Sequence, residues 1–100
     1  MELTANLLRI INQFFDIEKK SAQNSAVLRP LERIRNTFDE MGYRIHNPLG
    51  EKYNETRTDC EAGIVGSKLD NLVIVEVIKP IVHQNGLIIQ KGVVIVESRP

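Results

Sequence analysis

The chain has 100 residues, of which 13 are basic and 13 are acidic, so its formal net charge is zero. This balance argues against a nucleic-acid-binding protein, which would carry a basic stripe, and no acidic tail is present. The length suits one domain, or one helical part joined to one small β part. A helix pair and a small β unit would share little core, so we expect self-association.

The cysteine content and the hydropathy bear on location. Cys60 is the single cysteine and cannot form an internal disulfide, which fits a reducing cytosol. Glu2 stands where a secretory signal would carry a basic residue, so we expect no signal peptide. No apolar run approaches the roughly 20 residues of a membrane span. We therefore expect a cytoplasmic protein without a membrane partner.

The segment from Leu3 to Lys20 has the periodicity of an amphipathic helix. Its apolar residues recur at spacings of three and four, and Lys19 and Lys20 suit the negative C-terminal end of a helix. Thr4 is a candidate N-cap. The broad apolar face is either ordinary core or a dimer seam. Its members are Leu3, Leu7, Ile10, Phe14 and Ile17, widened by Leu8, Ile11 and Phe15.

A second amphipathic helix is predicted over residues 26–41. The polar residues 21–25 predict a turn of the length found between antiparallel helices, and Ser25 is a candidate N-cap. Gly42 suits the C-terminal cap. Pro30 lies in the first turn if the helix begins just before it, or at a kink if the helix begins at residue 26. One face carries Val27, Leu31, Ile34, Phe38 and Met41.

The rest of the chain predicts a β head. The residue before Pro48 avoids the helical conformation, which favours an extended stretch there. The expected segments are an extended stretch over 43–49, a polar loop over 50–58, a short strand over 61–65, a loop over 66–71 and several short strands over 72–97. The expected fold class is therefore α+β, with residues 1–42 as a helical dimerisation region and residues 43–100 as the β head.

Residues 72–97 are dominated by valine, isoleucine and leucine, which fit a pleated sheet. Asn85-Gly86 is the strongest hairpin signal in the chain, because both residues tolerate a positive φ. Lys91-Gly92 is a second, weaker turn signal. Pro80 cannot donate to a ladder, so it lies at a strand end, an edge or a bulge.

Alternation around Glu76 makes both faces of this region largely apolar. Strict alternation puts Val73, Val75 and Val77 on one face and Ile74, Glu76 and Ile78 on the other. Both faces then need a cover, part of which the rest of the chain must supply. Glu76 is either exposed to solvent or in contact with a partner.

No arrangement of residues indicates catalysis. The glycines form no phosphate-binding loop, and His46, Cys60 and His83 are too few and too scattered for a metal site. Cys60 beside a histidine would be a nucleophile and base, but a packed or surface cysteine is the preferred interpretation. Asp59 and Glu61 are better explained as solvated loop charges than as an acid–base pair. We expect no enzyme, no cofactor and no metal.

Two stretches after the helices carry a family resemblance. From Met41 the chain reads MGYRIHNPLGEKYNETRTDCEA, and from Ile74 it reads IVEVIKPIVHQNGLIIQKGVVIV. In this order, after two helices, they resemble the GrpE-type nucleotide exchange factors of DnaK-type chaperones. Tyr53 and Asn54 stand where the family has Phe-Asp, and Cys60 stands where it has the histidine of a His-Glu-Ala segment. The matching positions are Gly42, Ile45, Pro48, Gly50, Glu51, Glu61, Ala62, Val75, Glu76, Val77, Ile78, Ile88, Ile89, Val93, Val94 and Val96.

The chain departs from the family pattern in several places. The loop before Glu61 is longer, and the usual Gly-Tyr after the first strand of the last region is replaced by Ile81-Val82. Leu87 and Gln90 hold the positions of family arginines, and Lys91 that of a proline. The family's long N-terminal coiled coil is missing from this sequence, either naturally or by truncation.

The resemblance implies a homodimer in which two helices of each chain form a four-helix bundle. It also implies a β head that acts as a wing on the chaperone's nucleotide-binding domain and promotes ADP release. The implied dimer interface consists of Leu7, Ile10, Phe14, Leu31, Ile34 and Phe38. The implied chaperone-contact residues are Glu76, Asn85, Gly86, Leu87, Gln90, Lys91 and Val96.

Two other functions fit the sequence. One is a dimeric scaffold of the same fold without exchange activity, which the missing arginines favour. The other is a lipoyl- or biotinyl-type carrier domain, which the valine-rich strands favour. Such carriers present a lysine at a hairpin tip, and Lys79 beside Pro80 is the available candidate.

Overall fold

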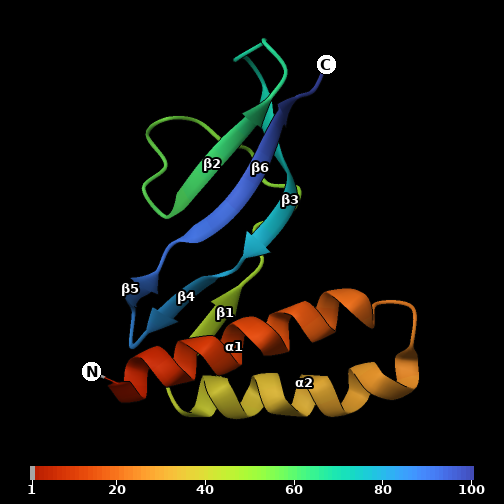
Figure 1. Cartoon of the computed structure of the whole chain (residues 1–100), viewed down its shortest axis with the longest axis vertical. Helices are drawn as coiled ribbons and strands as arrows, with labels where there is room; N and C mark the ends of the chain where they lie inside the picture. The colour runs from red at the N-terminus through yellow and green to blue at the C-terminus, as the bar shows by residue number, and fades with distance from the viewer. Residues whose placement is uncertain (1) are drawn as a thin grey trace.

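The structure is a computed structural model that describes residues 2–100. Two helices precede six short strands, which form two three-stranded sheets, and this arrangement confirms the expected α+β class. Figure 1 shows the helix pair side by side beneath one sheet, with the second sheet beyond it. The helices are α1 (Glu2–Lys20) and α2 (Ser25–Glu40), and the strands are β1 (Tyr43–His46), β2 (Cys60–Val65), β3 (Leu72–Lys79), β4 (Ile81–Gln84), β5 (Leu87–Gln90) and β6 (Gly92–Ser98).

The start of α2 differs from the prediction by one residue. Asn24 has an extended backbone, and its side chain accepts a hydrogen bond from the backbone N–H of Ala26 at 3.2 Å. Ser25 is already helical, so the prediction that Ser25 caps the helix is wrong, because an N-cap residue needs a non-helical backbone.

Pro30 lies inside α2, because the helix begins well before it. A proline there leaves the carbonyl of Ala26 without its helical donor, and both residues are exposed, so water can satisfy that group. The C-terminal prediction is confirmed: Gly42 follows the helix with a φ of +89°, and its N–H donates to the Asp39 carbonyl at 2.9 Å. Among residues 2–100, neither helix combines the length and apolarity needed to cross a membrane.

Sheet A consists of β1, β4 and β5 in that order, all antiparallel. The predicted hairpin is confirmed, since Asn85 and Gly86 join β4 to β5 with φ values of +50° and +86°. The tip of this hairpin reaches the end of α2, where the N–H of Asn85 donates to the Gly42 carbonyl at 2.9 Å. Sheet A is therefore held against the helical part of the chain.

Sheet B has the order β2-β6-β3, with β6 in the centre. β2 pairs with β6 in parallel, and β3 pairs with it antiparallel. The predicted turn at Lys91-Gly92 is wrong, because β5 and β6 belong to different sheets and do not pair. The chain instead passes from one sheet to the other through Lys91 alone.

The alternation predicted along β3 is also wrong. Leu72, Ile74 and Val77 are buried, whereas Val73 and Val75 are half-exposed, so Val77 shares a face with Ile74. Register shifts between Ile74 and Glu76, and between Val77 and Lys79, change the phase of the strand. Each extra residue of such a bulge moves the following side chains to the other face.

One apolar core runs from the helices through both sheets. Ile11 and Phe15 of α1 are buried in it together with Ile81 and Val82 of β4. Burial of one such side chain stabilises the fold by about 1.5–3 kcal/mol. Residues before and after Gly42 in the sequence belong to this one core, so the helices and the β strands stabilise each other.

Candidate partner-binding surfaces

An apolar groove lies between α1 and α2. It has a volume of about 400 Å³ and is lined by Arg9, Ile10, Gln13, Phe14, Ile17, Leu31, Ile34 and Phe38. The rings of Phe14 and Phe38 form its floor in an edge-to-face arrangement, with centroids 5.8 Å apart. Ile10, Ile17 and Ile34 leave 57%, 48% and 45% of their surface exposed. An apolar concavity of this kind is typical of a binding surface.

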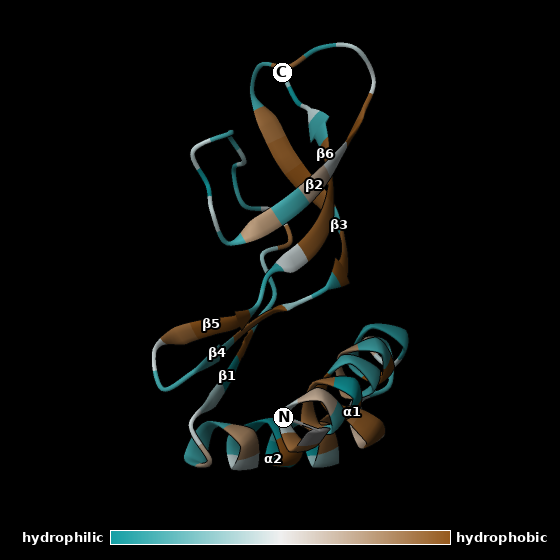
Figure 2. Ribbon diagram, turned by 60° about the vertical axis from the view of Figure 1, so that its left-hand side comes forward, coloured by the Kyte–Doolittle hydropathy of each residue, from teal (hydrophilic) through white to brown (hydrophobic). Residues whose placement is uncertain are grey.

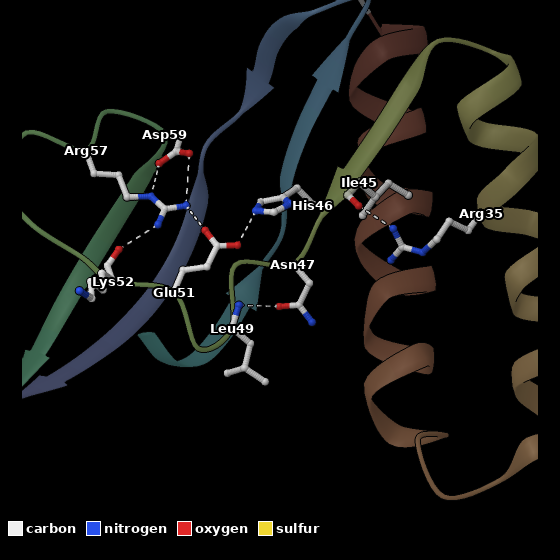
Figure 3. Close-up of polar contacts among 9 residues, drawn as sticks. All are labelled: Arg35, Ile45, His46, Asn47, Leu49, Glu51, Lys52, Arg57 and Asp59. Carbon is white, nitrogen blue, oxygen red and sulfur yellow. Dashed lines mark hydrogen bonds and ion pairs between the residues drawn. The ribbon is translucent and has the colours of Figure 1, made fainter. Parts of the chain in front are cut away.

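Arg35 fixes the two helices relative to β1. Its guanidinium donates to both carboxylate oxygens of Glu18, at 2.6 and 3.0 Å, and to the backbone carbonyl of Ile45. It also lies 5.8 Å from the centroid of the Phe14 ring. One side chain thereby joins α1, α2 and sheet A, and Figure 3 shows its contact with Ile45.

The six predicted dimer residues separate into two groups. Phe14, Leu31 and Phe38 are at least 92% buried within one chain, so they hold the helices together. The exposed Ile10 and Ile34 line the groove, and Leu7 is half-buried against the core. Periodicity alone predicts the shared face, but it cannot divide that face between internal packing and outward surface.

The predicted chaperone-contact residues do not form one surface. Asn85, Gly86 and Leu87 meet at the tip of the β4–β5 hairpin, where Leu87 exposes 74% of its surface. Figure 2 shows β5 of this hairpin in the brown of hydrophobic residues. Glu76 is exposed on β3, in the other sheet, and Lys91 is exposed between the sheets. Val96 is fully buried in β6, so its side chain offers no contact surface to a partner.

Gln90 is engaged within the chain. Its amide exchanges two hydrogen bonds with Asn12 of α1, at 2.9 and 2.8 Å, and donates a third to the carbonyl of Pro80. The reciprocal amide pair joins α1 to β5 across most of the sequence. Neither Asn12 nor Gln90 has a local sequence pattern that predicts this contact.

A polar cluster joins residues of the loop between β1 and β2 to one another and to His46 at the end of β1 (Figure 3). Arg57 contacts Asp59 at 2.6 Å, Glu51 at 2.7 Å and the carbonyl of Lys52 at 3.0 Å. Glu51 also contacts the imidazole of His46 at 2.7 Å. The hydrogen bond from Arg57 lowers the pKa of Asp59, and that same bond raises the pKa of Arg57. The cluster is fully paired, which is typical of a structural tie.

Cys60 has the environment of a packed cysteine. Its side chain is buried at the start of β2, and this burial, together with the charge of Asp59, raises its pKa to about 11. A thiol that remains protonated at neutral pH is a poor nucleophile. Among residues 2–100, no group of three or more histidine, cysteine, aspartate or glutamate side chains is arranged to hold a metal ion.

Comparisons of the chain with protein-family models, with curated proteins and with solved structures find no significant match.

Proposed function

We propose that this chain is a cytoplasmic, homodimeric nucleotide exchange factor for a DnaK-type chaperone. It binds the chaperone's nucleotide-binding domain and promotes the release of ADP. The observation that carries the proposal is that two regions, the groove between α1 and α2 and the tip of the β4–β5 hairpin, each expose large apolar side chains. One region serves the dimer and the other serves the chaperone.

The groove supports the dimer. A second copy related by a two-fold axis would cover Ile10, Ile17 and Ile34 of each chain and would complete a bundle of four helices. The three isoleucines would then gain the burial that they lack in a single chain.

The hairpin supports the contact with the chaperone. Leu87 projects from a tip that is held to Gly42 by a backbone hydrogen bond, so it is presented on a fixed support. An exchange factor needs no catalytic group, because it acts by binding the open state of its partner more tightly than the closed state.

The release of a fluorescent ADP analogue from a DnaK-type chaperone of the same organism tests the proposal. We expect the chain to accelerate release and Leu87→Asp to reduce the acceleration about tenfold or more, because a charge would replace a buried apolar contact. Leu49→Asp is the matched control, since Leu49 is also exposed but lies in the β1–β2 loop. If the chain is a folded dimer and does not accelerate ADP release, the exchange function is excluded.

The second candidate is a dimeric scaffold of the same fold without exchange activity. Gln90 stands where the GrpE-type family has an arginine, and its side chain is hydrogen-bonded within the chain to Asn12 and Pro80. These contacts favour the scaffold. Chaperone binding without faster ADP release would support this candidate. The carrier-domain alternative gains no support, because Lys79 ends β3 next to the buried Pro80 and is not at a hairpin tip.

A further inference from the structure

The two outer edges of sheet B differ in their backbone hydrogen bonding. The outer edge of β3 is covered by residues 50–53, through hydrogen bonds to the backbones of Leu72 and Ile74 and a bridge between Lys52 and Val73. β2 pairs with β6 on one side, and within residues 2–100 no backbone hydrogen bond is made on its other side. Figure 1 shows β2 as the outermost strand of this sheet.

The register identifies the backbone groups that line the open edge. The Asp59 carbonyl accepts from the N–H of Gly92 at 2.9 Å, which starts the parallel ladder between β2 and β6. In a parallel ladder the bonds to one neighbour come from alternate residues. The N–H and C=O groups of Ala62 and Ile64 therefore point outward, away from β6.

The open edge has few of the features that usually protect one. Natural edge strands carry charged side chains, above all lysine, or a proline or a bulge, or are very short, and Glu61 is the one charged residue of β2. β2 has six residues, reads CEAGIV, and pairs with β6 without a register shift. Its outward backbone is consequently free to pair with another extended segment.

A hollow reaches from the β3 side of sheet B to Ile64 on the edge strand β2. It has a volume of about 560 Å³, and its apolar lining comes from Tyr53, Ile64, Leu69 and Leu72. Ile64 and Leu69 expose 46% and 67% of their surface. In a paired strand, the residue opposite Ile64 would share the face of Ile64 and would contact this exposed apolar side chain.

The one charged residue within β2 is acidic. Glu61 is exposed on β2 and Glu55 lines the hollow, and within residues 2–100 neither takes part in an ion pair. Glu61 and Ile64 are three residues apart, so they lie on opposite faces of the strand. A cationic side chain opposite Glu61 would form a favourable cross-strand pair.

We propose that the edge of β2 binds an extended, cationic peptide segment of a partner protein, which adds to sheet B as a fourth strand. The segment carries an apolar side chain opposite Ile64 and a lysine or arginine opposite Glu61, three residues away. A second copy of this chain is a poorer occupant, because its own β2 contains no lysine or arginine that could face Glu61. The proposal is independent of the exchange function.

Amide NMR of the isotope-labelled full chain tests the proposal. The probe is a blocked threonine-rich peptide that contains one leucine and one lysine three residues apart. We expect the peptide to shift the Ala62 and Ile64 amides and to slow their hydrogen exchange. Shifts confined to the groove between α1 and α2 would overturn the proposal. The proposal would also be overturned if the Ala62 and Ile64 amides exchanged slowly without any peptide and this protection disappeared when the protein was diluted. That result would identify a second copy of the chain as the occupant of the edge.

Two methylated peptides separate strand addition from apolar adhesion. N-methylation of the peptide residues whose N–H groups face β2 should weaken binding about tenfold or more, because it removes the shared hydrogen bonds. Methylation of the alternate set, whose N–H groups point away, should leave binding intact. Equal affinities of the two peptides would overturn the proposal.

Variants of exposed residues complete the test without affecting the core. Ile64→Lys should weaken binding about tenfold, since it replaces the apolar contact with a charge like that of the peptide. Leu49→Lys, a similar change at an exposed residue of the β1–β2 loop, should have no effect. Glu61→Gln should weaken binding, whereas Glu40→Gln on α2 should not. Equal effects within either pair would contradict the assigned edge.

Discussion

Arg57 shows how one side chain can order a long loop. The segment between β1 and β2 contains no regular strand, yet it crosses from sheet A to sheet B and covers the edge of β3. Arg57 supplies that order, because its guanidinium contacts two carboxylates and a backbone carbonyl at once. The identity of this residue therefore affects both sheets.

We expect Arg57→Met to lower the free energy of unfolding by about 1–2 kcal/mol, because Glu51 and Asp59 would lose their shared donor. Urea denaturation measures the loss. Arg99→Met is the control, since Arg99 is more exposed and contacts Glu97 at 3.3 Å, and its effect should stay within about 0.5 kcal/mol. Equal losses in the two variants would contradict the role given to Arg57.

The hydrogen bond between Arg57 and Asp59 also makes the stability of the fold depend on pH in the acidic range. Because Arg57 lowers the pKa of Asp59 in the folded state, the stabilisation is fully present above the unfolded pKa of about 3.9. It is lost as the pH falls through the lower folded value. Stability measured between about pH 5 and pH 2 should therefore fall less in Arg57→Met than in the parent chain.

Cys60 gives the opposite sign of pH dependence. Its folded pKa of about 11 lies above the unfolded value of about 8.5, so the folded state holds the thiol proton more tightly. We expect its contribution to stability to be complete below about pH 8.5 and to decline as the pH rises toward 11. Iodoacetamide should modify the folded thiol slowly at pH 8 and the urea-unfolded thiol rapidly. Equal rates would show that the thiol is accessible.

At the scale of the element, Gly92 shows why β6 can begin where it does. A Cβ atom at this position would lie 2.9 Å from Cγ1 of Ile81 and 3.2 Å from Sγ of Cys60. The absence of a side chain lets β6 start beside β4 and β2 at the junction of the two sheets.

Gly92→Ala should therefore destabilise the fold by about 1–3 kcal/mol through overpacking. Gly63→Ala on β2 is the matched control, because its Cβ would meet only Cδ1 of Ile95, at an ordinary 3.4 Å. Thermal denaturation of both variants distinguishes a tight contact from a general cost of removing glycine. A neutral Gly92→Ala would contradict the packing described at the junction.

The elements that sequence predicts well are those with local causes. Both helices follow from apolar periodicity, and the β4–β5 hairpin follows from the conformational freedom of Asn85-Gly86. The bulges of β3, and the change from sheet A to sheet B at Lys91, depend on pairing with strands that are distant in the sequence. No local sequence pattern therefore predicts them. For the candidate surfaces, the sequence predicts the exposed Leu87 but also names the buried Val96, because two apolar strand positions look alike without their neighbours.

At the scale of the whole molecule, the position of the groove selects the substitution that tests the dimer. Phe14 and Phe38 are poor choices, because each is also part of the core of a single chain. Ile34 is better, since it lines the groove and is 45% exposed.

Ile34→Asp should convert the proposed dimer to a folded monomer, because a carboxylate would be buried at the seam. Sedimentation velocity measures the mass, and circular dichroism confirms that the helices persist. Leu49→Asp introduces the same charge outside the groove and should leave the mass unchanged. An unchanged mass for both variants would exclude this groove as the seam.

The central place of β6 also determines when sheet B can form during synthesis. β2 and β3 do not pair with each other, and the strand that joins them is the last of the six to be made. Sheet A can assemble before β6 has left the ribosome, because all three of its strands come earlier in the chain. The nascent chain therefore carries β2 and β3 without their common neighbour until β6 emerges, a state in which exposed edges favour aggregation.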